Sequence, residues 1–174
     1  AMGAAGVAAG KETMFDLINE VSELVYVADF DTYDLLYVNT AGREMFQIKE
    51  GLAGRKCYEV LQGRDAPCPF CTNAYLSDGQ NYNWEFTNPI LGRHYLLKDR
   101  LVDWEGKKAR LEIAFDISES VLEREKLQNT LDAEQMVLDC VRGLYQGDTL
   151  ADGMNGTLAT LGTYLGADRT YIFE

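Results

Sequence analysis

An abrupt change of hydrophobic period after Asp116 constrains the fold of this chain more than any other feature. Residues 108–118 alternate between apolar and polar side chains, as a strand with one buried face does. The apolar face of this stretch carries Ala109, Leu111, Ile113, Phe115 and Ile117, and the other face carries Arg110, Glu112 and Asp116. The spacing then becomes helical, because Ser120 followed by Glu123 is a capping-box pattern. The chain therefore joins a sheet directly to a helix that we expect to reach about Tyr145.

Other strands are indicated by runs of β-branched and aromatic residues. These runs are 24–29, 35–39, 83–88 and 93–104. With 108–118 they predict a five-stranded antiparallel sheet with one buried face and an α+β fold. Short helices are expected on one face of the sheet: one capped by Thr40, and two in the segment from Gln47 to Gly79 (CYEVLQ and CTNAYLSD).

Two amphipathic helices flank the sheet. The first begins at Lys11, and its apolar face is formed by Met14, Leu17, Ile18 and Val21. The second is the long helix, whose 3-4 spacing marks a coiled-coil seam with polar interruptions. The seam positions are Ile117, Ser120, Arg124, Leu127, Leu131, Glu134, Leu138, Val141 and Tyr145. We expect a parallel homodimer through residues 118–145, with the helix packing along its own domain as the alternative.

The end of the chain predicts the start of another domain. A further helix is marked by Leu150, Met154, Leu158, Leu161 and Leu165, and RTYIFE then begins a strand that has no partner. The expected organisation is a vector-derived remnant or flexible lead (1–10), a sheet-containing domain with its N-terminal helix (11–117), a connecting helix (118–147) and a truncated domain start (148–174).

The charge of the chain limits its partners. The sequence has 16 basic and 28 acidic residues, for a net charge of −12. Such a surface repels phosphate backbones and anionic lipid, so neither nucleic acid nor a membrane surface is expected as a partner. No apolar run approaches the roughly 20 residues that span a bilayer. The opening AMGAAGVAAG lacks the basic and apolar regions of a signal peptide, which favours a reducing, cytoplasmic location.

Three of the four cysteines lie in CYEVLQGRDAPCPFC, residues 57–71. Cys57, Cys68 and Cys71 could bind zinc or an iron–sulfur cluster, although a fourth protein ligand is not evident. They could also form a reversible disulfide, or be ordinary residues of a helix and a turn. We expect Cys57 to be buried, and Cys68 and Cys71 to share a helical turn. Cys71 would then feel the positive end of that helix, which favours a thiolate.

The order of these elements resembles a PAS domain. The residues that carry the resemblance are VYVADFDTYDLLYVN, the GRKCYEVLQGRDAPCPFC segment, HYLLKDRLVDWEGKKARLEIAFDIS and the Asp116-Ile117-Ser118 junction. The junction in the family is usually D-I-T, and Ser118 keeps the hydroxyl group. LGTYLGADRTYIFE resembles the first helix and strand of a GAF domain.

The resemblance implies a sensory module of a bacterial signalling protein rather than an enzyme. In such proteins the output is commonly a GGDEF diguanylate cyclase or a histidine kinase, and the sequence contains neither. A change in the pocket would move the last strand, and Asp116, Ile117 and Ser118 would relay it to a dimeric helix. Polar seam residues Arg124 and Glu134 would keep that dimer from settling into one state.

The resemblance also implies a cavity between the sheet and its helices. Its candidate lining residues are Tyr26, Trp84, Phe86, Tyr95 and Phe115, which would accept an apolar or planar small molecule. His94 is interpreted as a structural or surface residue of a strand. The neighbours of Cys57 do not match a flavin photoreceptor motif.

Two other functions remain open from the sequence. The first is a thiol redox catalyst that uses Cys68 and Cys71, although the strand and βαβ context that such catalysts need is missing. The second is a dimerisation module that binds no ligand.

Overall fold

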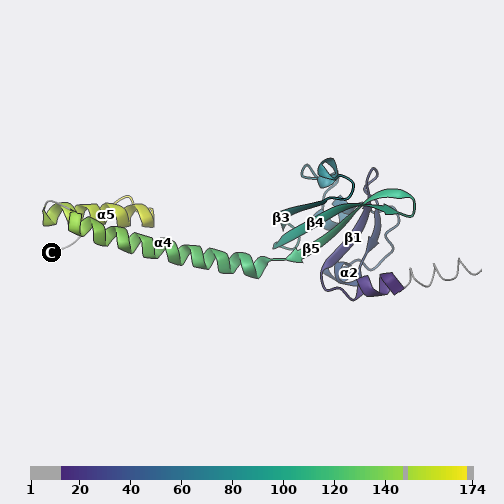
Figure 1. Cartoon of the computed structure of the whole chain (residues 1–174), viewed down its shortest axis with the longest axis horizontal. Coiled ribbons are helices and arrows are strands. Elements are labelled where there is room, and N and C mark those ends of the chain that lie inside the picture. The colour runs from purple at the N-terminus through teal and green to yellow at the C-terminus, as the bar shows by residue number, and fades with distance from the viewer. Residues whose placement is uncertain (1–12, 147–148, 172–174) are drawn as a thin grey trace, which may run out of the picture. The chain divides into compact units, whose positions relative to one another are not determined.

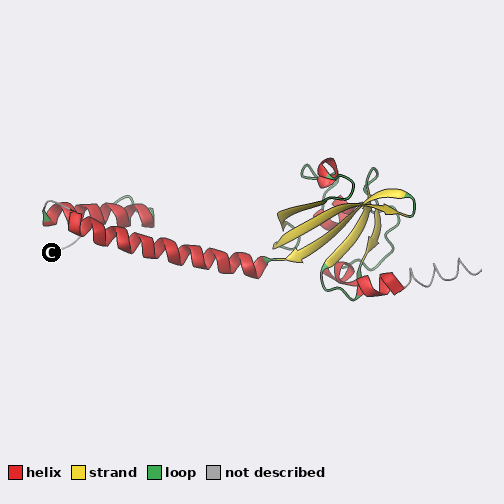
Figure 2. Cartoon of the chain, viewed as in Figure 1, coloured by secondary structure: helices red, strands yellow, loops and turns green. Residues whose placement is uncertain are grey.

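The computed structural model describes residues 13–146 and 149–171, which fall into two compact units divided after Glu119. The first unit is built on one antiparallel sheet of five strands in the order β2-β1-β5-β4-β3 (Figure 1; Figure 2). Its strands are β1 (Leu24–Asp29), β2 (Leu35–Val38), β3 (Asn81–Asn88), β4 (Arg93–Trp104) and β5 (Lys107–Asp116). The predicted α+β fold with a five-stranded antiparallel sheet is confirmed.

Three short helices lie between β2 and β3: α2 (Thr40–Met45), α3 (Cys57–Gln62) and the 3₁₀ helix η1 (Thr72–Tyr75). Side chains of α3 pack with one face of the sheet, which we call the inner face. The buried core of this face includes Leu24, Tyr26, Cys57, Val60, Leu61, Tyr95, Leu97 and Ala114. The core therefore sits between α3 and the central strands.

Asn39 organises the start of the sheet. It is fully buried, and its Oδ1 accepts hydrogen bonds from the backbone of Val25 and of Gly42, both at 3.0 Å. Its Nδ2 donates to the carbonyl of Glu23 at 2.8 Å. Asn39 is thus the cap of α2, and the prediction that Thr40 caps this helix was wrong by one residue.

The N-terminal helical segment, residues 13–19, packs through a different face from the one predicted. Phe15 contacts Tyr37 and Trp104, with ring centroids 5.2 and 5.6 Å apart. Leu17 of the predicted apolar face is 67% exposed. The helix therefore uses its aromatic residue to cover the outer face of the sheet, which α3 does not cover.

The largest difference from the sequence interpretation concerns β5. The alternation is present, but the polar residues point into the core: Arg110 and Glu112 are each 6% exposed. Leu111, Ile113 and Phe115 alternate with them on the outer face and are only half-buried. The pattern identified the strand correctly, and the side that the helices cover was misassigned.

The segment around the cysteines is a set of tight turns. Gly63 ends α3 in the left-handed region (φ 63°), which a residue without Cβ adopts readily. The backbone N–H of Cys71 donates to the carbonyl of Cys68 at 3.1 Å, which closes a turn with Pro69 at its second position. The helix η1 starts after this turn and has four residues, so Cys71 is not in a helical first turn as predicted.

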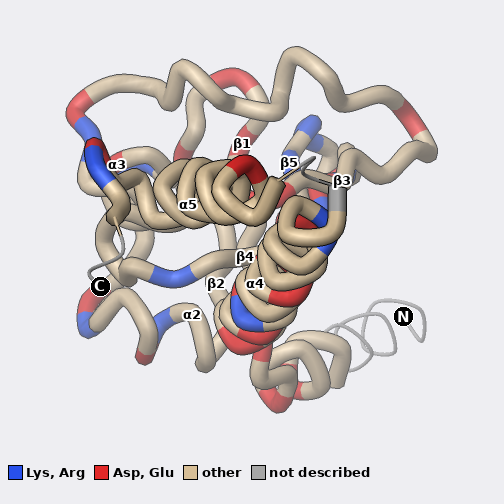
Figure 3. Tube along the Cα trace, turned by 90° about the vertical axis from the view of Figure 1, so that its left-hand side faces the viewer, with Lys and Arg blue, Asp and Glu red and all other residues tan. Residues whose placement is uncertain are grey.

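The second unit contains α5 (Leu150–Leu165) and all but the first residues of α4 (Ser118–Gln146). Thr157 Oγ1 donates to the carbonyl of Cys140 at 3.1 Å, so α5 packs along the C-terminal part of α4. A Cβ on Gly153 would lie 2.9 Å from the carbonyl oxygen of Leu144, and the small residue therefore allows the close approach. Charged residues, most of them acidic, recur along α4 (Figure 3).

Within the described chain, no helix is long and apolar enough to cross a membrane. The predicted strand at the C-terminus is not found: residues 169–171 have no strand structure, and 172–174 lie outside the described residues, as does the predicted lead 1–10. The predicted domain boundaries remain predictions.

Candidate functional site

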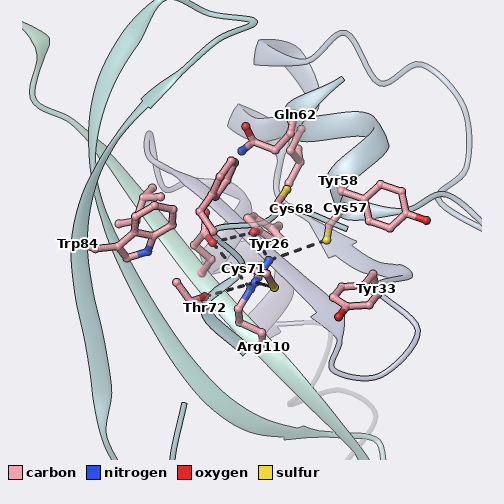
Figure 4. A pocket seen from close by; sticks show the side chains of 14 residues that line it. Tyr26, Tyr33, Cys57, Tyr58, Gln62, Cys68, Cys71, Thr72, Trp84 and Arg110 are labelled. Atoms are coloured by element: carbon pink, nitrogen blue, oxygen red, sulfur yellow. Dashed lines mark hydrogen bonds and ion pairs between the residues drawn. The ribbon is translucent and has the colours of Figure 1, made fainter. Parts of the chain in front are cut away.

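A small cavity lies between the inner face of the sheet and the segment from α3 to η1. Its volume is about 30 Å³, which is room for about two water molecules. Four strands contribute Tyr26, Trp84, Leu97, Arg110 and Glu112, and the opposite wall carries Cys57, Cys68 and Cys71 (Figure 4). The cavity therefore has a polar floor and a wall that contains three thiols.

Arg110 is the central residue of the cavity. Its Nη2 donates to the phenol oxygen of Tyr26 at 2.7 Å, and its Nη1 donates to Cys71 Sγ at 3.3 Å (Figure 4). The same Nη1 donates to Asn73 Oδ1 at 3.1 Å. Cys57 Sγ lies 3.9 Å from Nη2. A single buried guanidinium thus joins β5 and β1 to the cysteine-containing segment.

A chain of polar groups continues from Arg110 across the sheet. The phenol of Tyr26 donates to Glu112 Oε2 at 2.7 Å. Glu112 lies directly opposite Asp99 in the β4–β5 register, and Trp84 Nε1 donates to Asp99 Oδ2 at 2.9 Å. The network therefore spans four adjacent strands, β1, β5, β4 and β3.

The charges of this network balance only if one carboxyl group is protonated. Arg110 supplies one positive charge, whereas Glu112 and Asp99 would supply two negative charges. Burial, followed by the charge of Asp99, raises the pKa of Glu112 well above its usual value. Asp99 Oδ1 is buried without a donor, and a proton on Glu112 supplies one. We therefore assign the neutral form to Glu112.

The thiols differ in their surroundings. Cys57 is 6% exposed, and burial raises its pKa to about 11, despite the opposing effect of Arg110. Burial also raises the pKa of the half-buried Cys68. All four cysteines are free. Among the described residues no three His, Cys, Asp or Glu side chains are grouped to hold a metal ion, so zinc or iron–sulfur binding by Cys57, Cys68 and Cys71 remains a prediction.

The junction between β5 and α4 is held by side chains of β4 and β5. Asp116 Oδ1 accepts from the backbone N–H of Ser118 at 3.0 Å, and its Oδ2 pairs with Arg93 Nη1 at 2.8 Å. The Ser118 hydroxyl accepts from the backbone of His94 at 3.0 Å, and Ile117 N–H donates to the His94 carbonyl at 2.9 Å. Burial opposes ionisation of Asp116, but the bonds from Ser118 and Arg93 outweigh it and lower its pKa. The three predicted relay residues thus fix the start of α4 to two strands.

No family model matches the sequence, and no curated protein is detectably similar to it. Solved structures do match. One is the PAS domain of an HTR-like protein from Haloarcula marismortui, with 18% identity, a TM-score of 0.52, and coverage of 65% of this chain and 96% of that domain. The chain has a PAS fold. A second match is an RNA-binding light-oxygen-voltage receptor, with 19% identity, a TM-score of 0.54, and coverage of 75% of this chain but only 40% of the receptor. At these identities the likeness concerns the fold alone.

The PAS fold brings four of the five predicted pocket residues to the inner face. Tyr26 and Trp84 line the cavity around Arg110, and Phe86 and Tyr95 line an adjoining cavity of about 20 Å³. Phe115 lines neither of these cavities. It belongs to the outer face of β5, where the Lys98 ammonium lies 5.1 Å from the centre of its ring. Its assignment to the pocket was wrong, because the pocket faces the other side of the strand.

Three buried charged residues were not predicted from the sequence: Arg110 and Glu112, which line the cavity, and Asp99, which accepts a hydrogen bond from the cavity residue Trp84. One signal was present. Each of them alternates with apolar residues in a long strand, and in β4 Asp99 follows Tyr95 and Leu97 on the same face. A charged residue in phase with core residues is unusual unless it is paired.

Proposed function

We propose that this chain is a sensory PAS module of a signalling protein. A small ligand or a redox cue acts at the cavity around Arg110, and the resulting change passes along β5 to α4 and then to an output domain. The observation that carries the proposal is the continuity of the path. Arg110 contacts the cysteine-containing wall, and β5 ends at Asp116, which bonds the start of α4.

The size of the cavity supports a cue of few atoms. About 30 Å³ is far below the roughly 300–1,000 Å³ of pockets that hold drug-sized ligands. A larger planar ligand would first have to displace core side chains such as Trp84. A diatomic or triatomic molecule, a proton, or a covalent change at a lining thiol needs no such rearrangement.

Relay through a dimer is supported by the surface of α4. Leu127, Leu131, Leu138 and Val141 follow the seam spacing and are 45–62% exposed. The close contacts of α4 with α5 involve Cys140 and Leu144, which lie outside the seam. The seam is thus free of these contacts, and we propose that a second copy of this chain covers it, in parallel, through residues 118–145.

The output is proposed to be a diguanylate cyclase, with a histidine kinase as the alternative, and 148–174 to be the first part of a GAF domain. The support is the sequence resemblance of LGTYLGADRTYIFE and the presence of α5 where that resemblance requires a helix. No residue of the described cavity needs to be catalytic in this scheme.

Amide hydrogen exchange tests the link from cavity to helix. Arg110→Lys keeps the charge but loses the forked contacts with Tyr26 and Cys71. We expect exchange of the backbone N–H groups at 117–122 to accelerate by about fivefold or more, which corresponds to about 1 kcal/mol of coupling. The matched control is Arg100→Lys, an exposed arginine on the outer face of β4. Equal exchange in the two variants would contradict the proposed path.

A further inference from the structure

The cavity brings together three thiols and a buried guanidinium, an arrangement that neither the fold nor the predicted relay requires. Arg110 Nη1 lies at hydrogen-bond distance from Cys71 Sγ, and the same guanidinium approaches Cys57. The Nε of Arg110 is buried and has no hydrogen-bond partner, and Glu112 Oε2 lies 3.8 Å from it. The cavity has room for about two water-sized molecules. A hydrogen peroxide molecule fits this space and can accept hydrogen bonds from a guanidinium.

Only one of the three thiols is placed to react first. Cys57 is buried, and its pKa of about 11 keeps it a neutral thiol at physiological pH. Cys68 is half-buried, and its pKa is also raised by burial. Cys71 is half-buried like Cys68, but its sulfur accepts an N–H hydrogen bond from Arg110 Nη1 at 3.3 Å. An N–H donor in this position can also donate to a peroxide oxygen while the sulfur attacks it.

The turn places a second thiol close to the first. The bond between Cys71 N–H and the Cys68 carbonyl closes a four-residue turn, in which the end Cα atoms are separated by less than about 7 Å. A disulfide spans Cα separations of about 4.4–6.8 Å. Cys68 and Cys71 can therefore be joined with little movement of the backbone.

We propose that Cys71 and Cys68 form a peroxide-responsive switch in the wall of the cavity. The thiolate of Cys71 attacks one oxygen of hydrogen peroxide, an S–O bond forms, the O–O bond breaks, and the departing hydroxide takes up a proton to become water. Sulfur loses two electrons and peroxide gains them. The thiol of Cys68 then attacks the sulfenic sulfur, the S–S bond forms, the S–O bond breaks, and a second water leaves.

Oxidation would be sensed through Arg110. A disulfide sulfur is a poor hydrogen-bond acceptor, so the bond from Nη1 to Cys71 is lost, while Arg110 keeps its hydrogen bonds to Tyr26 and Asn73. This step rests on the proposed function, whereas the thiol chemistry does not. If the oxidation experiment fails, another cue could still act through the path from the cavity to α4. That path is tested separately by amide hydrogen exchange in the Arg110→Lys variant.

The sequence allows the disulfide to be mapped directly. Trypsin cleaves after Lys56, Arg64 and Arg93, so Cys57 falls in peptide 57–64, and both Cys68 and Cys71 fall in peptide 65–93. The reduced chain is treated with one equivalent of hydrogen peroxide, its free thiols are alkylated, and it is digested without a reductant. We expect peptide 65–93 to be unalkylated and lighter by two hydrogen atoms than the reduced, unalkylated peptide. Treatment with dithiothreitol before alkylation should allow both cysteines to be alkylated.

Cys140 serves as an internal reference, because its sulfur contacts Met136 Sδ and a backbone carbonyl, neither of which stabilises negative charge. Cys71 should be oxidised faster than Cys140 by about tenfold or more. In Cys68→Ser the sulfenic acid should persist on Cys71 and be trapped by dimedone, and in Cys71→Ser peptide 65–93 should stay reduced. Both substitutions are at half-buried positions and conserve side-chain size.

Three results would overturn the proposal. The first is oxidation of Cys71 no faster than that of Cys140, which would make it an ordinary surface thiol. The second is a cross-link between peptides 57–64 and 65–93, which would replace Cys68 with Cys57 as the partner. The third concerns the Cys71→Ser variant. If Cys68 is labelled by dimedone there as fast as Cys71 is oxidised in the wild type, Cys71 is not the residue that reacts first.

Discussion

Replacing Glu112 with glutamine isolates the proton that the buried network is inferred to hold. Glutamine has the shape of a protonated glutamate: its amide oxygen can accept from Tyr26, and its NH₂ group can donate to Asp99. Glutamine does not titrate. The free energy of unfolding of the wild type, minus that of Glu112→Gln, therefore reports the ionisation of this one carboxyl group.

The sign follows from the raised pKa of Glu112. The folded chain keeps the proton at pH values where the unfolded chain has lost it, so the stability from neutral Glu112 is fully present below the unfolded pKa, about 4.3. It is lost as the pH rises toward the folded pKa. Within that window, the difference between wild type and variant should fall by about 1.4 kcal/mol per pH unit.

Other carboxyl groups have the opposite sign. The pKa of Asp29 is lowered, chiefly by a backbone hydrogen bond from Thr32, so its contribution is present above its unfolded pKa and is lost as the pH falls. Hydrogen bonds from Lys56 and Thr32 do the same for Asp34. These contributions are shared by wild type and variant, and they cancel in the difference.

The assay is urea unfolding at intervals from pH 5 to pH 8, followed by tryptophan fluorescence, since Trp84 and Trp104 both lie in the sheet. Glu59→Gln, on the exposed side of α3, is the matched control for the loss of a carboxyl group, and the pH dependence of Glu112→Gln is compared with it. A constant difference between wild type and Glu112→Gln across this range would refute the assignment of a neutral Glu112.

Three further predictions concern the cap of α2, the dimer seam of α4 and the packing of α5. Asn39→Ala should lower the free energy of unfolding by about 3 kcal/mol or more, measured in urea, because it leaves buried backbone groups without partners. Leu131→Asp should give a monomer in sedimentation at micromolar concentration. Asn129→Asp adds the same charge on the opposite side of α4 and should remain a dimer. A wild type that is already monomeric would contradict the proposed dimer. Gly153→Ala should destabilise the packing of α5 on α4, measured by thermal unfolding, by about 1–3 kcal/mol, whereas Gly156→Ala, with nothing within 4 Å of its added Cβ, should be neutral or stabilising.

The strands were predictable because each contains, within its own sequence, the residue types and the alternation that favour a strand. β1 and β4 were placed at both ends from β-branched, aromatic and alternating residues alone, and the change to a helix after Asp116 was found from the change of period. These signals depend on neighbours in the chain. The order of the strands in the sheet, β2-β1-β5-β4-β3, was not predicted from the sequence.

The candidate site was predicted only in part, because periodicity does not say which face of a strand the helices cover. The outer face of β5 is apolar and half-buried, and it was taken for the core. Arg110 and Glu112 are tolerated inside only because Tyr26 and Asp99, from two other strands, complete their hydrogen bonds and charge balance. That compensation is a property of the tertiary structure and leaves no local pattern.

The cap of α2 and the turn at Cys68 were misjudged for a related reason. Asn39 and Thr40 are both good capping residues, and the choice is decided by the buried backbone groups that Asn39 satisfies outside the helix. Pro69 is compatible with the first turn of a helix and with the second position of a β-turn. The bond from Cys71 to Cys68 decides for the turn.

The central claim, that the cavity and the pairing of α4 are coupled, is tested most directly by the dissociation constant of the dimer. Sedimentation equilibrium compares the wild type with Arg110→Lys and Arg100→Lys. If the two are coupled, Arg110→Lys, which changes no seam residue, raises the dissociation constant by about fivefold or more, while Arg100→Lys leaves it within about twofold, less than 1 kcal/mol. Equal dissociation constants for the two variants would contradict the coupling.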